Sequence, residues 1–306
     1  MTSRAVVFAY HNVGVRCLSV LLGQGVEVPL VVTHRDNPSE RIWFDSVAQL
    51  AARHDIPVVT PGDPAAVAAN IGSLAPDFLF SFYYRHMLPP ALLKLPARGA
   101  LNMHGSLLPN YRGRVPVNWA IIRGETGTGA SLHYMVEKPD AGDLVDQQSV
   151  PILPDDTALE VFQKVTVATE LVLHRSLPGL LAGTAPRVPL DLSRGSYFGG
   201  RKPEDGRIDW TGSARSVHDL VRAVAPPYPG AFCDIQGVRV TVHRTVRESG
   251  MEKRFASPTL FAENERCYAQ CGDGAILRLE AVEIPGRMAG STGWVGNLPA
   301  LPLPLI

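Results

Sequence analysis

A short polar motif lies at the end of a predicted strand near residue 100. Asn102 and His104 are two residues apart at the close of the apolar run Ala100–Met103. Residues i and i+2 of an extended strand face the same side, so we expect both side chains to converge on one point. An Asn amide can donate a hydrogen bond to a developing oxyanion, and a His can transfer a proton near neutral pH. The pair alone is a weak indication, because a His at a strand end is more often simply hydrogen-bonded in a turn.

The elements that must position this motif alternate between apolar runs and helix-like segments. Predicted strands cover residues 5–10, 26–33, 57–59, 77–82 and 100–103, and helix-like segments between them include 15–22, 44–54 and 65–74. Such alternation predicts a Rossmann-like, doubly wound, mostly parallel sheet with helices on both faces. Ligands bind at the carboxyl ends of such strands, which makes the residues just after Phe82 and Leu101 the expected place for chemistry. Tyr10–Gly14, after the first strand, contains no GxGxxG motif, which argues against a nicotinamide dinucleotide.

The amino-acid composition changes after a long amphipathic helix predicted over residues 157–181. Residues 183–206 are rich in Gly, Pro, Arg and Ser, which is typical of a linker or an exposed functional loop. A helix is then predicted at 216–223, followed by β-like runs at 232–235, 238–243, 266–271 and 275–282, with a hairpin signal at Gly272–Gly274. We therefore predict a catalytic α/β domain over residues 1–203 and a small antiparallel, β-barrel-like (OB-like) domain over residues 204–306.

Composition narrows the class of protein. The formal net charge is zero, because there are 29 Lys and Arg residues and 29 Asp and Glu residues. The sequence also lacks a basic cluster, and both observations argue against a nucleic-acid partner. No charged segment precedes a long apolar one, and no apolar stretch approaches the roughly 20 residues that span a bilayer. The four cysteines form no CxxC pair, which favours reduced thiols over a metal site or disulfides. We expect a cytoplasmic protein without membrane insertion.

Two longer segments give the Asn–His pair a context. They are NMHGSLLPNYRG, from Asn102 to Gly113, and MVEKPDAGD, from Met135 to Asp143. The chain resembles the 10-formyltetrahydrofolate-dependent formyltransferases in both segments. In that family an Asn, a His and an Asp form the catalytic set, so the resemblance implies that Asn102, His104 and Asp140 are catalytic. It also implies 10-formyltetrahydrofolate as formyl donor, an amine as acceptor and no metal.

The same resemblance implies binding residues for both substrates. Folate contacts, made largely by backbone, are expected at His86, Met87, Leu88, Val136, Glu137, Lys138, Pro139 and Asp140. Contacts to a nucleotide sugar are expected at Tyr111, Arg112, Arg114 and Arg201. Arg201 lies in a segment, YFGGRKPED, that is similar to a loop of the sugar formyltransferases, and its planar donor fork suits a phosphate or ribose. Without the family, a solvated basic turn would be the more natural interpretation of that segment.

Further segments are similar to the formyltransferase domain that acts on UDP-4-amino-4-deoxy-L-arabinose. They include VVFAYH at 6–11, THRDNP at 33–38, SFYYRH at 81–86 and PGA at 229–231, and the resemblance covers about residues 4–282. It implies a nucleotide-sugar acceptor, a role in lipid A modification and polymyxin resistance, and a decarboxylating dehydrogenase, fused or separate, as a partner.

Three alternatives stay open from the sequence. A methionyl-tRNA formyltransferase would need a basic insertion soon after the second strand, whereas residues 34–55 are mixed in sign. A glycinamide ribonucleotide formyltransferase usually has a Gly-rich phosphate loop after the first strand and lacks an extra C-terminal domain. A non-catalytic folate- or nucleotide-binding protein would not need Asn102, His104 and Asp140 together.

Overall fold

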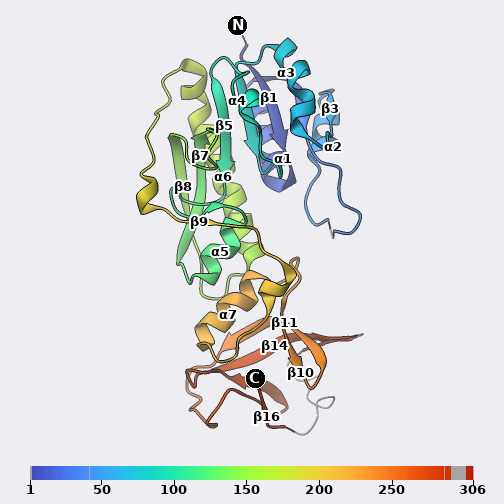
Figure 1. Ribbon diagram of the computed structural model, residues 1–306, viewed down its shortest axis with the longest axis vertical. Helices are drawn as coiled ribbons and strands as arrows, with labels where there is room; N and C mark the ends of the chain where they lie inside the picture. The colour runs from blue at the N-terminus through green and yellow to red at the C-terminus, as the bar shows by residue number, and fades with distance from the viewer. Residues whose placement is uncertain (1, 41, 286, 291–300, 306) are drawn as a thin grey trace. The chain divides into compact units, whose positions relative to one another are not determined.

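The computed structural model describes residues 2–40, 42–285, 287–290 and 301–305, and the chain forms two compact units (Figure 1). The first comprises Met1–Pro116, Thr128–Val150 and Gln163–Gly199, and the second comprises Val117–Gly127, Pro151–Phe162 and Gly200–Ile306. The predicted boundary between residues 203 and 204 stays a prediction.

The first unit is built on a seven-stranded sheet in the order β3-β2-β1-β4-β5-β7-β8 (Figure 1). Its strands are β1 (Arg4–Ala9), β2 (Glu27–Val32), β3 (Val58–Val59), β4 (Phe78–Phe82), β5 (Gly99–His104), β7 (Gly127–Tyr134) and β8 (Leu144–Pro151). Pairing is parallel from β3 through β5 and antiparallel between β5 and β7. The predicted Rossmann-like, mostly parallel sheet is confirmed.

Central strands of this sheet are apolar on both faces because helices cover both sides. All five residues of β4, FLFSF, are buried, and so are the last five residues of β1. Pro29 lies within β2, where its missing N–H coincides with an irregular register against β1 between Arg4 and Val6. Strand β3 pairs only with Val31 and Val32, so the segment around Pro29 needs no donor on that side.

Helices precede and follow these strands. They are α1 (His11–Gly23), α2 (Val47–Arg53), the 3₁₀ turn η1 (Pro64–Val67), α3 (Ala68–Leu74), α4 (Pro90–Leu93), α5 (Pro116–Ile122) and α6 (Ala158–Ala182). The predicted helix over 44–54 begins only at Val47, because Ser46 accepts a hydrogen bond from the Gln49 N–H and caps α2. The freed residues Phe44 and Asp45 line a hollow described below. Among the described residues, no helix has the length and apolar character needed to cross a membrane.

Part of the Gly- and Pro-rich segment 183–206 is ordered. It holds the 3₁₀ turns η2 (Leu192–Arg194) and η3 (Pro203–Gly206), and between them β9 (Tyr197–Phe198), which pairs in parallel with β6 (Arg112–Gly113). The segment is therefore more than a linker, because it forms a two-stranded sheet with the motif that follows Asn102.

The second unit contains α7 (Ala214–Ala223) and an antiparallel sheet. The strands are β10 (Ala231–Ile235), β11 (Val238–Arg247), β12 (Thr259–Glu263), β13 (Arg266–Gln270), β14 (Ile276–Ile284), β15 (Arg287–Gly290) and β16 (Leu303–Pro304). They pair in the order β10-β11-β14-β13-β12-β16, with β15 beside β14, which confirms the predicted small antiparallel C-terminal fold (Figure 1). The face of α7 that carries Val217 and Val221 packs into the hydrophobic core of the second unit, together with strand residues such as Val242 and Leu279.

Candidate active site

Asn102 and His104 end strand β5, and the structure brings both to Asp140. Asp140 Oδ1 lies 3.5 Å from Asn102 Nδ2 and 3.5 Å from His104 Nδ1. A second imidazole, that of His133, completes the cluster, with Nε2 3.2 Å from Asn102 Nδ2 and 3.6 Å from Asp140 Oδ1. Asn102 and His133 are cross-strand partners in the antiparallel pairing of β5 with β7. One carboxylate, one amide and two imidazoles therefore share a single site.

The ionisation of Asp140 is set by opposing effects. Burial raises the pKa of this carboxyl, but the charges and hydrogen bonds of His104 and His133 and the Gly113 N–H together hold the pKa well below its usual range. The Gly113 N–H donates to Oδ2 at 2.8 Å. Asp140 itself adopts a φ of +49°, in the left-handed region that is uncommon for residues other than Gly. The residue is thus an anion in the working range of pH, held in an unusual backbone conformation.

Backbone carbonyls fix where the protons of the two histidines sit. His104 Nε2 is 2.8 Å from the Tyr111 carbonyl oxygen, and His133 Nδ1 is 2.9 Å from the Tyr134 carbonyl oxygen. A carbonyl only accepts, so each of these nitrogens carries a hydrogen. The other nitrogen of His104, Nδ1, then faces the Asp140 carboxylate at 3.5 Å. The ring is thus oriented between the Tyr111 carbonyl and Asp140.

The Asn102 amide nitrogen contacts both His133 Nε2 and Asp140 Oδ1. The 3.2 Å contact to His133 is shorter than the 3.5 Å contact to Asp140. The Asn102 N–H directed at Asp140 is therefore the one more readily redirected into a hydrogen bond to a ligand oxygen. A site with this donor and the neighbouring His104 imidazole can stabilise negative charge that develops on a carbonyl oxygen.

The residues expected to contact folate flank this cluster along the chain. Leu88 is buried in the core beneath the sheet edge, whereas Met87 is 61% exposed. On the other side Val136 is 47% exposed, Glu137 and Lys138 are exposed, and Pro139 is half-buried. His86 is exposed, and its ring centroid lies 4.8 Å from that of His34 in an edge-to-face arrangement. Two exposed apolar side chains, Met87 and Val136, thus come from the segments named for folate.

The residues expected to contact a nucleotide sugar have diverse surroundings. Arg112 is buried, and its Nε has no hydrogen-bond partner among the described residues. Arg114 is exposed, and its N–H donates to the Phe198 carbonyl. Tyr111 stacks on Phe198 at a centroid distance of 5.2 Å. Within the second unit, Arg201 lies 4.9 Å from the ring centroid of Trp119 and donates to the Asp205 carbonyl, and burial lowers the pKa of its guanidinium.

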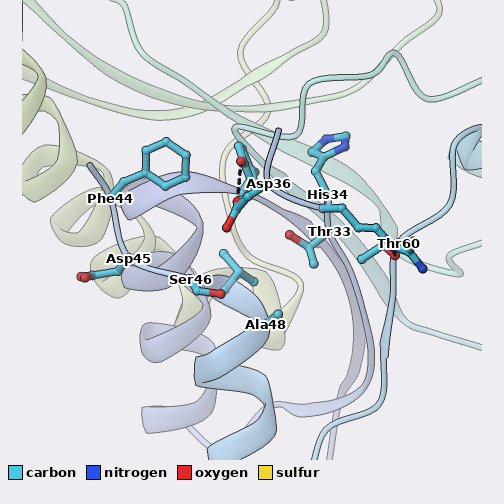
Figure 2. Close-up of a pocket in the computed structure, with 11 residues that line it drawn as sticks. Thr33, His34, Asp36, Phe44, Asp45, Ser46, Ala48 and Thr60 are labelled. Atoms are coloured by element: carbon cyan, nitrogen blue, oxygen red, sulfur yellow. Dashed lines mark hydrogen bonds between the residues drawn. The ribbon is translucent and has the colours of Figure 1, made fainter. Parts of the chain in front are cut away.

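A hollow opens at the carboxyl ends of β1, β2 and β3 (Figure 2). Its walls come from the segment after β2 on one side and the segment that leads into α2 on the other; the lining residues are Tyr10, Thr33, His34, Arg35, Asp36, Phe44, Asp45, Ser46, Val47, Ala48 and Thr60. The Tyr10 hydroxyl donates to Asp36 Oδ1 at 2.8 Å, which orients that carboxylate at the rim of the hollow. Burial and this hydrogen bond raise the pKa of Tyr10 to about 12.

Histidines beside this hollow are held neutral. Burial, with a smaller contribution from the Arg85 charge, lowers the pKa of His11 to about 3. Burial and the charges of His86 and Arg85 lower the pKa of His34 to about 4, and His34 Nε2 accepts the Arg85 backbone N–H at 3.0 Å. Both rings pack against aromatic side chains. The ring centroids of His11 and Phe44 are 3.9 Å apart, and those of His34 and Tyr84 are 4.1 Å apart.

Comparison with known proteins matches both parts of the chain to formyl transferases. Residues 17–178 match the family described as formyl transferase, and residues 201–293 match the formyl transferase C-terminal domain. The chain belongs to the formyl transferase family. The protein is therefore a formyltransferase, and the cluster around Asp140 lies in the part of the chain that the first match covers.

Solved structures share the fold of this formyltransferase. An N-formyltransferase from Helicobacter canadensis, in complex with folinic acid and dTDP-3-aminofucose, is 19% identical with a TM-score of 0.71 over 91% of this chain and 99% of that one. WlaRD, a sugar 3N-formyl transferase determined in the presence of dTDP and 5-N-formyl-THF, is 16% identical with a TM-score of 0.70 over 94% and 99%. HypX from Aquifex aeolicus in complex with tetrahydrofolic acid is 18% identical with a TM-score of 0.65, over 97% of this chain and 47% of that one.

His133 was not predicted to belong to the site of this formyltransferase. A buried His in a strand is usually a hydrogen-bonded structural residue, and its bond to the Tyr134 carbonyl fits that description. Its contact with Asn102 depends on the antiparallel register of β5 and β7, and no strand was predicted over residues 127–134. His133 could have been placed in the site only by predicting this strand and its register with β5.

Proposed function

We propose that this formyltransferase transfers the formyl group of 10-formyltetrahydrofolate to the amine of a nucleotide-linked amino sugar, with UDP-4-amino-4-deoxy-L-arabinose as the specific acceptor. The observation that carries the proposal is the Asn102, His104 and Asp140 cluster. It combines an amide donor, an imidazole and a carboxylate within 3.5 Å contacts at the carboxyl edge of the sheet. The role in lipid A modification and polymyxin resistance follows from that acceptor and belongs to the same proposal.

The transfer balances without any further reactant. The amine nitrogen forms a bond to the formyl carbon, the bond between that carbon and N10 breaks, and one proton passes from the amine to N10. Asn102 and His104 donate hydrogen bonds to the formyl oxygen as negative charge develops on it. Asp140 orients His104 through its contact with Nδ1, and its position beside both donors allows it to accept the proton that the amine releases.

The donor side fits a flat heterocycle. Met87 and Val136 are apolar side chains left 61% and 47% exposed on the two segments that flank the cluster. An aromatic ring system bound between them would bury that surface, and backbone groups of the 136–140 segment would supply polar contacts. We therefore propose His86 to Leu88 and Val136 to Asp140 as the folate-binding segments.

The acceptor side fits a nucleotide diphosphate. A buried guanidinium is costly unless an anion compensates it, and Arg112 Nε has no hydrogen-bond partner in the part of the chain that the structure describes. The hollow of Figure 2 offers the Asp36 carboxylate and the Thr33 and Thr60 hydroxyls to ribose, and aromatic walls to a base. The lining residues at the end of β2 lie three strand spacings from β5, or roughly 14 Å. That span is comparable to the length of a nucleotide diphosphate sugar.

The neighbours in structure favour the same acceptor class. The Helicobacter canadensis enzyme was solved with dTDP-3-aminofucose and folinic acid, and WlaRD with dTDP. UDP-4-amino-4-deoxy-L-arabinose is proposed over other amino sugars because of the segments at 6–11, 33–38 and 81–86. Arg201, three residues after β9 along the chain, is retained as a proposed phosphate or ribose contact.

A panel of acceptors tests the proposal. Wild-type protein and the variants Asn102→Ala and His104→Ala are incubated with 10-formyltetrahydrofolate and, in turn, UDP-4-amino-4-deoxy-L-arabinose, a dTDP-linked 4-amino sugar, glycinamide ribonucleotide and methionyl-tRNA. Each variant should lose about 10²–10³ in kcat, the usual cost of one oxyanion donor. Asn70→Ala and His54→Ala, which alter exposed residues away from the cluster, should retain wild-type kcat. Formylation of only the tRNA or the ribonucleotide would contradict the acceptor assignment.

A further inference from the structure

The segment Tyr111–Gly113 contacts two of the proposed catalytic side chains through its backbone. The Tyr111 carbonyl accepts a hydrogen bond from His104 Nε2 at 2.8 Å, and the Gly113 N–H donates to Asp140 Oδ2 at 2.8 Å. The two side chains are thus oriented by main-chain atoms only two residues apart. Any displacement of this segment alters the geometry of both groups at once.

The other edge of the segment is attached to Ser196–Phe198. The Arg112 N–H donates to the Ser196 carbonyl at 3.0 Å, and the Arg114 N–H donates to the Phe198 carbonyl at 3.0 Å. The Tyr111 N–H donates to the Ser196 hydroxyl at 2.9 Å. The Phe198 ring stacks on the Tyr111 ring with an interplanar angle of 12°. Four contacts therefore connect Ser196–Phe198 to Tyr111–Gly113, a segment about 85 residues away in sequence.

The backbone of this attachment is tight. Tyr111 has a φ of +56°, which a residue with a side chain adopts only when neighbouring contacts enforce it. Gly113 has a φ of +98°, and a Cβ placed there would lie 2.1 Å from the Phe198 carbonyl oxygen. The close approach of β6 and β9 thus requires glycine at position 113, and the Tyr111 conformation requires the partners that hold it.

We propose that Ser196 and Phe198 are positioning residues for formyl transfer: they fix Tyr111–Gly113 so that its carbonyl and its N–H hold His104 and Asp140 in the reactive arrangement. Both residues act through the segment Tyr111–Gly113. The inference deepens the proposed function, on which its kinetic consequence rests, and it assigns a catalytic consequence to a segment whose composition suggests a linker.

The Ser196→Ala variant tests the proposal with the smallest structural change. It removes the hydroxyl that accepts the Tyr111 N–H but keeps the Ser196 carbonyl that accepts the Arg112 N–H. Displacements of about 1 Å at a reacting group cost up to roughly 10²-fold, so we expect kcat to fall about tenfold or more while KM for the formyl donor changes by less than about twofold. Ser193→Ala is the matched control, because the Ser193 hydroxyl donates to Asp191, the N-cap of its own turn η2, and the variant should retain wild-type kcat.

The Phe198 ring gives a second, independent test. Phe198→Ala removes the stack on Tyr111 and should lower kcat as Ser196→Ala does, whereas Phe198→Tyr preserves the ring and should restore most of the lost rate. A merely structural role would lower the melting temperature without this division between kcat and KM and without rescue by the aromatic variant.

A measurement without turnover separates this inference from the proposed function. In ¹⁵N-histidine NMR spectra, Ser196→Ala should shift the ring-nitrogen resonances of His104, because the hydrogen bond from Nε2 to the Tyr111 carbonyl is altered. His218, bonded to Thr245 and to the Pro154 carbonyl in the second unit, should keep its resonances. A shift at His104 in a protein that formylates no amine would refute the proposed function and keep the positioning role. Unchanged His104 resonances together with kcat within about twofold of wild type would overturn the positioning role.

Discussion

Replacement of Asp140 by Asn separates the charge of this residue from its shape. The amide keeps the size of the carboxylate and an oxygen that can accept the Gly113 N–H. It removes the negative charge that lies 3.5 Å from His104 Nδ1. Two unit charges at that separation attract by about 5 kcal/mol at an effective dielectric constant of about 20. A positive charge that develops on the His104 ring in the transition state therefore loses this stabilisation.

The rate effect follows from that energy. The Asp140 side chain is 13% exposed, so solvent screens part of the attraction. We take a loss of about 3–4 kcal/mol in the transition state, which at about 1.36 kcal/mol per tenfold corresponds to a kcat lower by roughly 10²–10³. Steady-state kinetics with saturating formyl donor and acceptor measures it, and a kcat within about threefold of wild type would refute the role assigned to the charge.

Stability measurements exclude unfolding as the cause of that loss. The pKa of Asp140 is depressed in the folded protein, so its ionised form stabilises the fold at pH values above the unfolded pKa of about 3.9, and the contribution is lost as the pH falls through the native value. Asp140→Asn should therefore be less stable than wild type to urea at pH 7, and this difference should diminish as the pH is lowered below about 4. A variant that is fully folded at the assay temperature yet slow supports the electrostatic explanation.

Two further substitutions have defined outcomes. Arg112→Met removes a buried guanidinium while keeping an unbranched side chain. It should raise KM for the nucleotide acceptor at least about tenfold and leave KM for the formyl donor unchanged. Equal effects on the two KM values would argue against a role of Arg112 in acceptor binding. Gly113→Ala places a Cβ 2.1 Å from the Phe198 carbonyl oxygen and must separate β6 from β9. We expect kcat to fall by about 10²-fold. An active, normally folded variant would show that the close approach of β6 and β9 is unimportant for the rate.

Local sequence patterns predicted the parallel half of the sheet well. The strands around Val7, Val31, Phe80 and Leu101 are short apolar runs bounded by helices, and each run is buried on both faces as that pattern requires. The expectation that Asn102 and His104 share a face depends only on the two-residue period of a strand.

The antiparallel side and the site geometry needed information that no local pattern contains. Strand β7 begins with GTGAS, small and polar residues that indicate a turn rather than a strand, so the partner of β5 was not anticipated. His133 reaches Asn102 only through that pairing. Strand β9 is two residues long and lies in a Gly-rich segment, and its pairing with β6 is a long-range contact that composition conceals. The family resemblance supplied Asp140, whose approach to the cluster depends on a φ of +49° that the sequence does not reveal.

The most direct measurement of the central claim follows the formyl carbon itself. Wild-type protein is incubated with 10-[¹³C-formyl]tetrahydrofolate and UDP-4-amino-4-deoxy-L-arabinose, and products are analysed by mass spectrometry and ¹³C NMR. Formyl transfer predicts a ¹³C-labelled formamide on the sugar nitrogen, together with tetrahydrofolate, at a rate that depends on the amine and falls in Asn102→Ala. Release of labelled formate at a rate independent of the amine, with an unmodified amino sugar, would contradict it.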